Sequence, residues 1–104
     1  MMLPAEAKSI AIWGYGREGR ASYNYLKNQG ITADISIIAD DEPSHTPDGC
    51  NVLVGDAGNH AIAGGNFDLI IKSPGISLYR PEVIAGKKAG SVFTSATNIW
   101  LQAN

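Results

Sequence analysis

The sequence predicts an α/β fold built on a parallel β-sheet, and three observations lead to this prediction. Short apolar runs alternate along the chain with segments of helical spacing, as in sheets whose parallel strands are joined by crossover helices. The strand candidates are apolar along their length, as expected of strands covered on both faces. A glycine-rich turn joins the first strand to the first helix. We therefore expect a small Rossmann-like sheet of about five strands with helices on both faces.

The individual elements follow from local patterns. Strands are expected at the short apolar, β-prone runs, and helices where apolar residues recur every three to four positions between turn-forming residues. In chain order, the expected elements are a strand at 9–13, a helix at 17–29, strands at 33–40 and 50–55, a weak helix at 59–65, a strand from 67 that runs into a turn at 73–75, a helix at 81–88, a strand at 91–95 and a helix at 97–104.

Turn-forming residues set the expected boundaries. Gly30 and Gly90 stand just past two of the helices, where a helix C-cap favours glycine. Pro81 suits the first position of a helix, and Thr97 is the expected N-cap of the last one. Residues 42–49 hold two of the five prolines and are expected to form a loop.

Composition limits the classes of protein that fit. The chain has 104 residues, enough for a single domain spanning 1–104. A net charge of −2 gives no basic surplus for a nucleic-acid partner. The single cysteine fits a reducing compartment, and neither a secretory signal nor a bilayer-spanning apolar run is present. We expect a soluble cytoplasmic domain.

Three polar clusters follow expected strands, at 14–19, 40–42 and 73–75. The carboxyl ends of parallel strands meet at one edge of a sheet, and ligands of open α/β sheets bind there. We therefore expect the three clusters to form one binding site.

The first cluster, IAIWGYGREGR, carries Gly14, Gly16 and Gly19 in the spacing G-x-G-x-x-G. The first glycine allows a tight turn, the second lets the backbone approach a phosphate, and the third lets the helix pack closely on the strand. The backbone N–H groups of Arg17 and Glu18, at the start of the helix, would then face an anion. The pattern predicts a phosphate-containing ligand; without one it is a tight strand–helix turn.

The other clusters offer hydrogen-bonding groups. Asp40 ends the second strand 21 residues after Gly19, where an acid can accept hydrogen bonds from sugar hydroxyls or a base N–H. Ser73 offers a hydroxyl, Pro74 stiffens the chain, and Gly75 permits a positive φ. Both clusters also fit plain loops. Tyr15 lies in the glycine turn, where it can cover a ligand ring or pack on its own domain.

Several kinds of chemistry find no support in the residues. His45, Cys50 and His60 lack the spacing of a metal site, so we expect no metal ligand and treat all three as structural. No nucleophile, base and orienting group stand out as a catalytic set. The ATP-binding pattern G-x-x-x-x-G-K-[ST] is also missing, so we expect no catalytic residue and no ATP hydrolysis by this chain.

Taken together, these motifs resemble the N-terminal domain of the Mur ligases. The segment FDLIIKSPGISLYRPEV resembles that family's Asp, Ser-Pro-Gly, apolar residue and later Pro, here Asp68, 73–75, Ile76 and Pro81. IAIWGYGREGRAS resembles its opening strand and turn, and SVFTSATNIWLQ its strand and helix leading into an ATPase domain. The resemblance covers roughly 9–103 and is greatest to the ligases that add glutamate to UDP-N-acetylmuramoyl-L-alanine.

The resemblance implies an excised UDP-substrate domain of an ATP-dependent, amide-bond-forming enzyme of peptidoglycan synthesis. The ATPase domain, the glutamate-binding domain, ATP and Mg²⁺ would belong to the full-length enzyme. The isolated domain would be inactive and would hold no cofactor. It also implies that the backbone of Arg17 and Glu18 meets the diphosphate, that Asp40 and Asp41 meet the uracil, and that residues 73–75 line the same pocket. Asp41 and Glu42 depart from the family's usual Thr or Ser and Arg, which argues against diphosphate binding by this loop.

Two alternatives remain open on the sequence. The glycine turn with Asp40 also suits an NAD(H)-binding Rossmann module of a dehydrogenase or a transporter-regulatory domain. A domain that uses its loops for protein contact, with an empty glycine turn, is the third possibility. The Ser-Pro-Gly turn favours the UDP-substrate domain, because a nicotinamide module has no use for it. The sequence does not decide whether the glutamate is the D or the L form.

Overall fold

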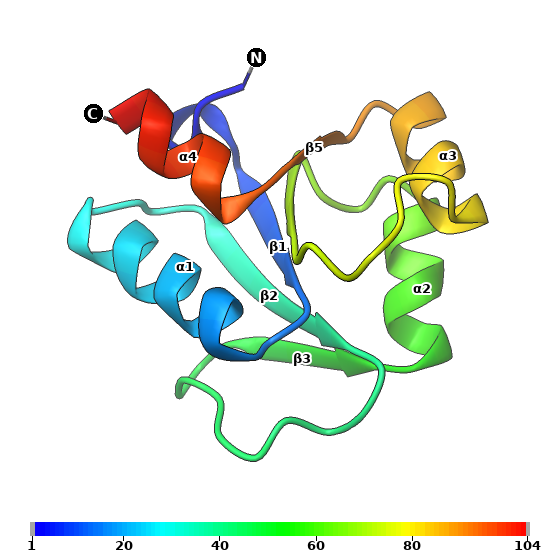
Figure 1. Ribbon diagram of the computed structural model, residues 1–104, viewed down its shortest axis with the longest axis horizontal. Helices are drawn as coiled ribbons and strands as arrows, with labels where there is room; N and C mark the ends of the chain where they lie inside the picture. Colours follow the sequence, from blue (N-terminus) through cyan, green and yellow to red (C-terminus); the bar gives the residue numbers. More distant parts are fainter. Residues whose placement is uncertain (1, 104) are drawn as a thin grey trace.

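The computed structural model describes residues 2–103, and its centre is a five-stranded parallel sheet (Figure 1). The strands are β1 (Ser9–Trp13), β2 (Asp34–Ala39), β3 (Asn51–Val54), β4 (Leu69–Lys72) and β5 (Val92–Thr94). They lie in the order β3-β2-β1-β4-β5, and every neighbouring pair is parallel. The chain builds outward from β1 to β3 and then returns to add β4 and β5 on the other side. The strand order therefore reverses between β1 and β4, where Rossmann-like sheets bind their ligands.

Helices cover both faces of this sheet. They are α1 (Arg17–Asn28), α2 (Asp56–Ala63), α3 (Pro81–Lys88) and α4 (Ala96–Ala103), preceded by a 3₁₀ turn at Pro4–Glu6. In Figure 1, α1 and α4 lie on one face, and α2 and α3 lie together on the other. The predicted fold class is therefore confirmed. Among residues 2–103, none of the helices has both the length and the apolar character needed to cross a membrane.

The core consists of two apolar layers that share the sheet. On one face, Ile10 and Ile12 of β1 pack in a cluster with Leu26 of α1. On the other face, Trp13 packs in a cluster with Val83 of α3. Consecutive residues of β1 point to opposite faces and are buried on both, which explains why this strand reads as a continuous apolar run.

The structure corrects the expected helix at 59–65. Helix α2 begins at Asp56 and ends at Ala63, so Gly58 lies inside it and not before it. A Cβ at Gly58 would lie 2.5 Å from Cγ2 of Ile38, so the glycine lets α2 sit close against β2. Local helix propensity disfavours glycine here, and tertiary packing requires it.

The N-cap of the last helix was also predicted wrongly. Ser95, not Thr97, caps α4, because the Ser95 Oγ accepts a hydrogen bond of 3.2 Å from the Asn98 N–H. Both residues are good caps by type, and the chain geometry after β5 selects the earlier one. Asn104, the last residue of the expected helix, lies outside the described residues.

The ends of the other helices agree with prediction. Helix α3 has the expected bounds, Pro81–Lys88, and α1 ends one residue earlier than expected. A glycine at positive φ follows each helix, Gly90 after α3 and Gly30 after α1. In α1, the Gly30 N–H donates to the carbonyl of Lys27 and the Ile31 N–H to that of Leu26, as in a Schellman motif.

Candidate functional site

The glycine turn follows β1 at the point where the strand order reverses. Gly14 has a φ of +93°, and a Cβ there would come 2.6 Å from the Ser73 Oγ. A Cβ at Gly19 would overlap the carbonyl oxygen of Gly14, so the close contact of α1 with β1 requires this glycine. No atom lies within 4 Å of a Cβ built on Gly16. Two glycines thus make the turn possible, and the third leaves open space above it.

The start of α1 carries backbone donors that the helix does not use. Gly16 is the N-cap, no side chain caps this end, and the first helical bond runs from the Arg20 N–H to the Gly16 oxygen at 3.0 Å. The N–H groups of Arg17, Glu18 and Gly19 therefore have no acceptor within the helix. Together with the helix dipole they favour an anion at this point. The side chains of Arg17 and Glu18 are exposed.

The Ser-Pro-Gly turn follows β4 and is held by hydrogen bonds around it. The Ile76 N–H donates to the Ser73 oxygen at 3.1 Å, and the Lys72 Nζ donates to the oxygens of Ser73 and Ile76 at 3.3 and 2.8 Å. Gly75 permits a positive φ but does not adopt one. A turn with Pro74 in its second position needs positive φ in the third only when it is type II, and this turn is not.

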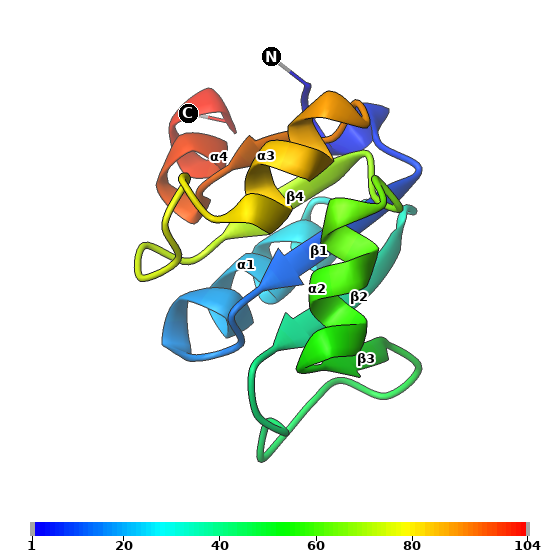
Figure 2. The same ribbon diagram turned by 90° about the vertical axis from the view of Figure 1, so that its right-hand side faces the viewer.

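The two turns line one open hollow of about 290 Å³. Its described lining consists entirely of residues that the sequence analysis selected, namely Gly14, Tyr15, Gly16, Arg17, Glu18, Gly19, Ser73 and Pro74. Figure 2 shows the turns after β1 and β4 leaving the same edge of the sheet. The predicted meeting of the first and third clusters is therefore present in the fold.

The second cluster follows the neighbouring strand. Asp40 and Asp41 come directly after β2, are exposed, and are not among the residues that line the hollow. Since β1 and β2 pair in parallel, both acids lie at the same edge of the sheet as the hollow. The arrangement offers a hollow with backbone donors in the middle and carboxylates one strand away, which suits an elongated ligand better than a compact one.

Tyr15 lines the hollow and lies near Cys50, at the end of the loop that begins with the two acids. It packs against the apolar cluster on the α1 face, and burial, then the nearby Cys50, raises its pKa. Tyr23 of α1 also has a raised pKa, through burial and then a hydrogen bond with Cys50. Cys50, at the end of the loop 40–50, therefore lies close to both Tyr15 and Tyr23. Within the described part of the chain, no three His, Cys, Asp or Glu side chains gather as metal ligands would.

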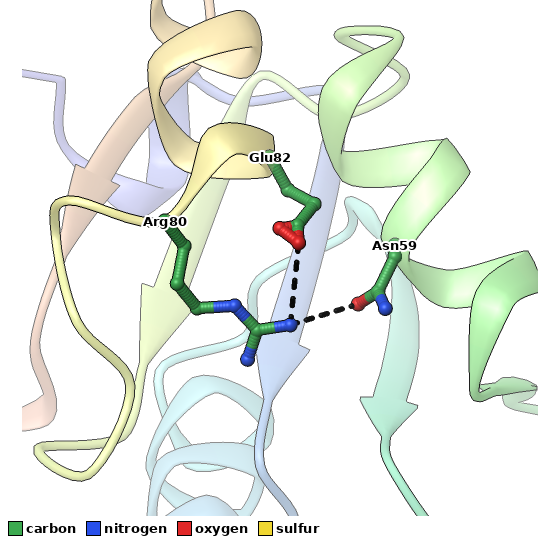
Figure 3. Close-up of polar contacts among 3 residues, drawn as sticks. All are labelled: Asn59, Arg80 and Glu82. Carbon is green, nitrogen blue, oxygen red and sulfur yellow. Dashed lines mark hydrogen bonds and ion pairs between the residues drawn. The ribbon is translucent and has the colours of Figure 1, made fainter.

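The sequence analysis missed one charged cluster near this edge (Figure 3). The Arg80 Nη2 lies 3.4 Å from the Asn59 Oδ1 of α2 and 3.4 Å from the Glu82 Oε1 of α3. The centre of the Arg80 guanidinium lies 5.1 Å from the centre of the Trp13 ring. The one signal in the sequence is that Arg80 precedes Pro81, a helix-starting residue, which places it at the N-cap of α3.

The electrostatics of Glu82 reflect this contact. Burial on its own raises the pKa of the Glu82 carboxyl. A hydrogen bond from its own backbone N–H and the neighbouring Arg80 guanidinium outweigh burial, so the pKa lies below its ordinary value of 4.5. Glu82 therefore remains a carboxylate, paired with Arg80, at neutral pH.

Comparison with known proteins points to one group of enzymes. No protein-family model matches the sequence. The UDP-N-acetylmuramoyl-L-alanine–L-glutamate ligase of Xanthomonas euvesicatoria pv. vesicatoria is 35% identical over 97 residues, which is 91% of this chain and 21% of the relative. The enzyme of the same name from Xylella fastidiosa is 33% identical over 103 residues, 95% of this chain and 22% of the relative.

A ligase named for D-glutamate is also similar. The UDP-N-acetylmuramoylalanine–D-glutamate ligase of Oenococcus oeni is 38% identical over 82 residues, 79% of this chain and 16% of the relative. The chain therefore spans about a fifth of the length of the first relatives it matches. Over nine tenths of its length, this chain is a homologue of the glutamate-adding ligases of the Mur family, and it matches a MurD-like N-terminal domain.

Proposed function

We propose that this domain binds the UDP end of UDP-N-acetylmuramoyl-L-alanine for a ligase that adds glutamate in peptidoglycan precursor synthesis. The observation that carries the proposal is the open hollow that the glycine turn and the Ser-Pro-Gly turn form at the reversal of strand order. The relatives that match the chain are named for this substrate, which supports the choice of ligand.

Each part of the site has a role in this proposal. The diphosphate lies in the hollow and accepts hydrogen bonds from the backbone N–H groups of Arg17 and Glu18. The uracil extends toward Asp40 and Asp41. Their carboxylates accept hydrogen bonds from the uracil ring N–H and from the hydroxyls of the attached sugar. Ser73 and Pro74 bound the hollow from the opposite side, and Gly75 follows them outside its lining. The domain supplies binding and orientation, with no catalytic residue of its own.

The chemical step belongs to the whole protein. We propose that regions beyond this chain bind ATP, Mg²⁺ and glutamate, and that the isolated domain is inactive. Relatives that match 91% and 95% of the chain are named for L-glutamate, whereas one that matches 79% is named for D-glutamate, which favours the L form. To test the choice of amino acid, the full-length protein is incubated with UDP-N-acetylmuramoyl-L-alanine, ATP and either L-glutamate or D-glutamate. ADP release with D-glutamate and none with L-glutamate would contradict the proposal.

The second candidate is an NAD(H)-binding module, which the glycine turn by itself also suits. Amide NMR titration separates the two. Under our proposal UDP shifts the amide signals of residues 15–19, 40–41, 73 and 75, and NADH leaves them unmoved. Shifts with NADH and none with UDP would overturn the proposal.

Gly16→Val tests the site directly. The added side chain occupies the open space above the turn, so we expect the UDP-induced shifts to disappear while the domain stays folded. Asn28→Val, at the exposed far end of α1, is the matched control and should bind UDP as the wild type does. A Gly16→Val variant that still binds UDP with wild-type affinity would place the ligand elsewhere.

A further inference from the structure

The segment 73–80, which connects β4 to α3, rests on Trp13 at both of its ends. At the start, the Ser73 N–H donates to the Trp13 carbonyl oxygen at 3.0 Å. At the end, the Arg80 guanidinium lies over the Trp13 ring, 5.1 Å from centre to centre. The ring is 1% exposed and belongs to the central strand, so it is a rigid platform.

Arg80 is fixed by three elements of the fold. The Trp13 ring belongs to β1, Asn59 to α2 and Glu82 to α3, and Figure 3 shows the guanidinium between the last two. Its side chain is 28% exposed, which leaves the contacts partly shielded from water. A planar guanidinium can stack on a ring and donate in its own plane at the same time, whereas a lysine ammonium cannot.

The middle of the segment has few contacts that could hold it. Pro74 and Gly75 are exposed, and so are Leu78 at 47% and Tyr79 at 88%. Ile76 is half-buried and packs against the apolar cluster that contains Trp13, so burial orders Ile76 but not the exposed residues 77–79. The arrangement of residues 77–79 depends on Ile76 at one end and on the Arg80 contacts at the other, with one hydrogen bond of 3.0 Å inside the stretch, from the Tyr79 N–H to the Ser77 Oγ.

We propose that Arg80 is a positioning residue that holds residues 77–80, and through them supports the Ser73-Pro74 wall of the hollow, in the arrangement that receives the ligand. Its effect on ligand binding rests on the proposed function, whereas its effect on the segment does not. Arg80 acts through Trp13, Asn59 and Glu82 and is not required to touch the ligand.

Backbone ¹⁵N relaxation of the ligand-free domain tests the positioning role. In Arg80→Ala we expect the order parameters of residues 77–79 to fall from about 0.85, typical of rigid backbone, to below about 0.6. Those of Ile12 and Ile71, in the central strands, should not change. Arg80→Lys keeps a cation near Trp13 but loses the bridge between α2 and α3. Its order parameters at residues 77–79 should therefore lie between those of the wild type and of Arg80→Ala. Lys87→Ala, an exposed lysine on α3, is the matched control and should match the wild type.

UDP titration of the same variants adds the functional readout. We expect Arg80→Ala to raise the Kd for UDP by about tenfold, since ordering even one residue on binding costs about that factor. Unchanged order parameters at 77–79 in both Arg80 variants would overturn the positioning role, even if the melting temperature fell. Failure of the wild type to bind UDP would refute the proposed function, while the order parameters would still decide the role of Arg80.

Discussion

Gly19→Ala sets two opposing effects against each other at the start of α1. Gly19 is buried in the first turn of this helix, where alanine is intrinsically the better helix former. An added Cβ, however, would overlap the Gly14 carbonyl oxygen and lie 3.2 Å from Cδ1 of Tyr15. Relief requires α1 to move away from the turn, because the first obstacle is backbone and not the end of a flexible side chain.

The two terms can be compared in size. Helix propensity favours alanine by about 1 kcal/mol. Overpacking at a tightly packed position costs about 1–3 kcal/mol, and a backbone obstacle places this site toward the upper part of that range. We therefore expect a net loss of about 1–2 kcal/mol in the free energy of unfolding. For a domain of this size, each kcal/mol corresponds to roughly 4–8 °C in Tm.

Urea unfolding followed by circular dichroism measures this difference. Ala21→Gly, at an exposed position of the same helix, calibrates the propensity term and should lose about 1 kcal/mol. The slope of the unfolding free energy against urea should stay constant in both variants, which shows that the native and denatured states keep their compactness. A Gly19→Ala variant as stable as the wild type, or more stable, would refute the reasoning, because propensity would then outweigh the contact with Gly14.

Two further predictions concern the helix starts on the C-terminal side of the fold. Ser95→Ala should lower the free energy of unfolding by about 1 kcal/mol, because the α4 cap is lost. Thr97→Ala should change the free energy of unfolding by no more than about 0.5 kcal/mol from the wild type. Equal losses of stability for the two variants in thermal unfolding would contradict the assignment of the cap. The lowered pKa of Glu82 should stabilise the wild type above the ordinary value of 4.5, and this stabilisation should be lost as the pH falls through the folded-state pKa. Glu82→Gln should flatten that part of the stability–pH curve, and an unchanged slope would show that Glu82 is not its source.

Much of the fold could be predicted because the signals are local. The apolar run of β1, the glycine after α1 and the proline that starts α3 each act within a few residues, and the structure confirms all three. The meeting of the two turns could also be anticipated, since parallel strands bring their carboxyl ends to one edge. The assignment of Asp40 and Asp41 to the ligand stays a prediction.

The sequence by itself determined which segments become strands and helices and which turns stand at the ligand edge, because periodicity and turn chemistry are properties of neighbouring residues. The tertiary structure alone decided the place of Gly58 inside a helix and the pairing of Arg80 with Trp13. Each depends on an element distant in the chain, since Gly58 is set by the approach of α2 to Ile38 and Arg80 by a ring 67 positions earlier. Such contacts follow from the packing of layers, which no local pattern encodes.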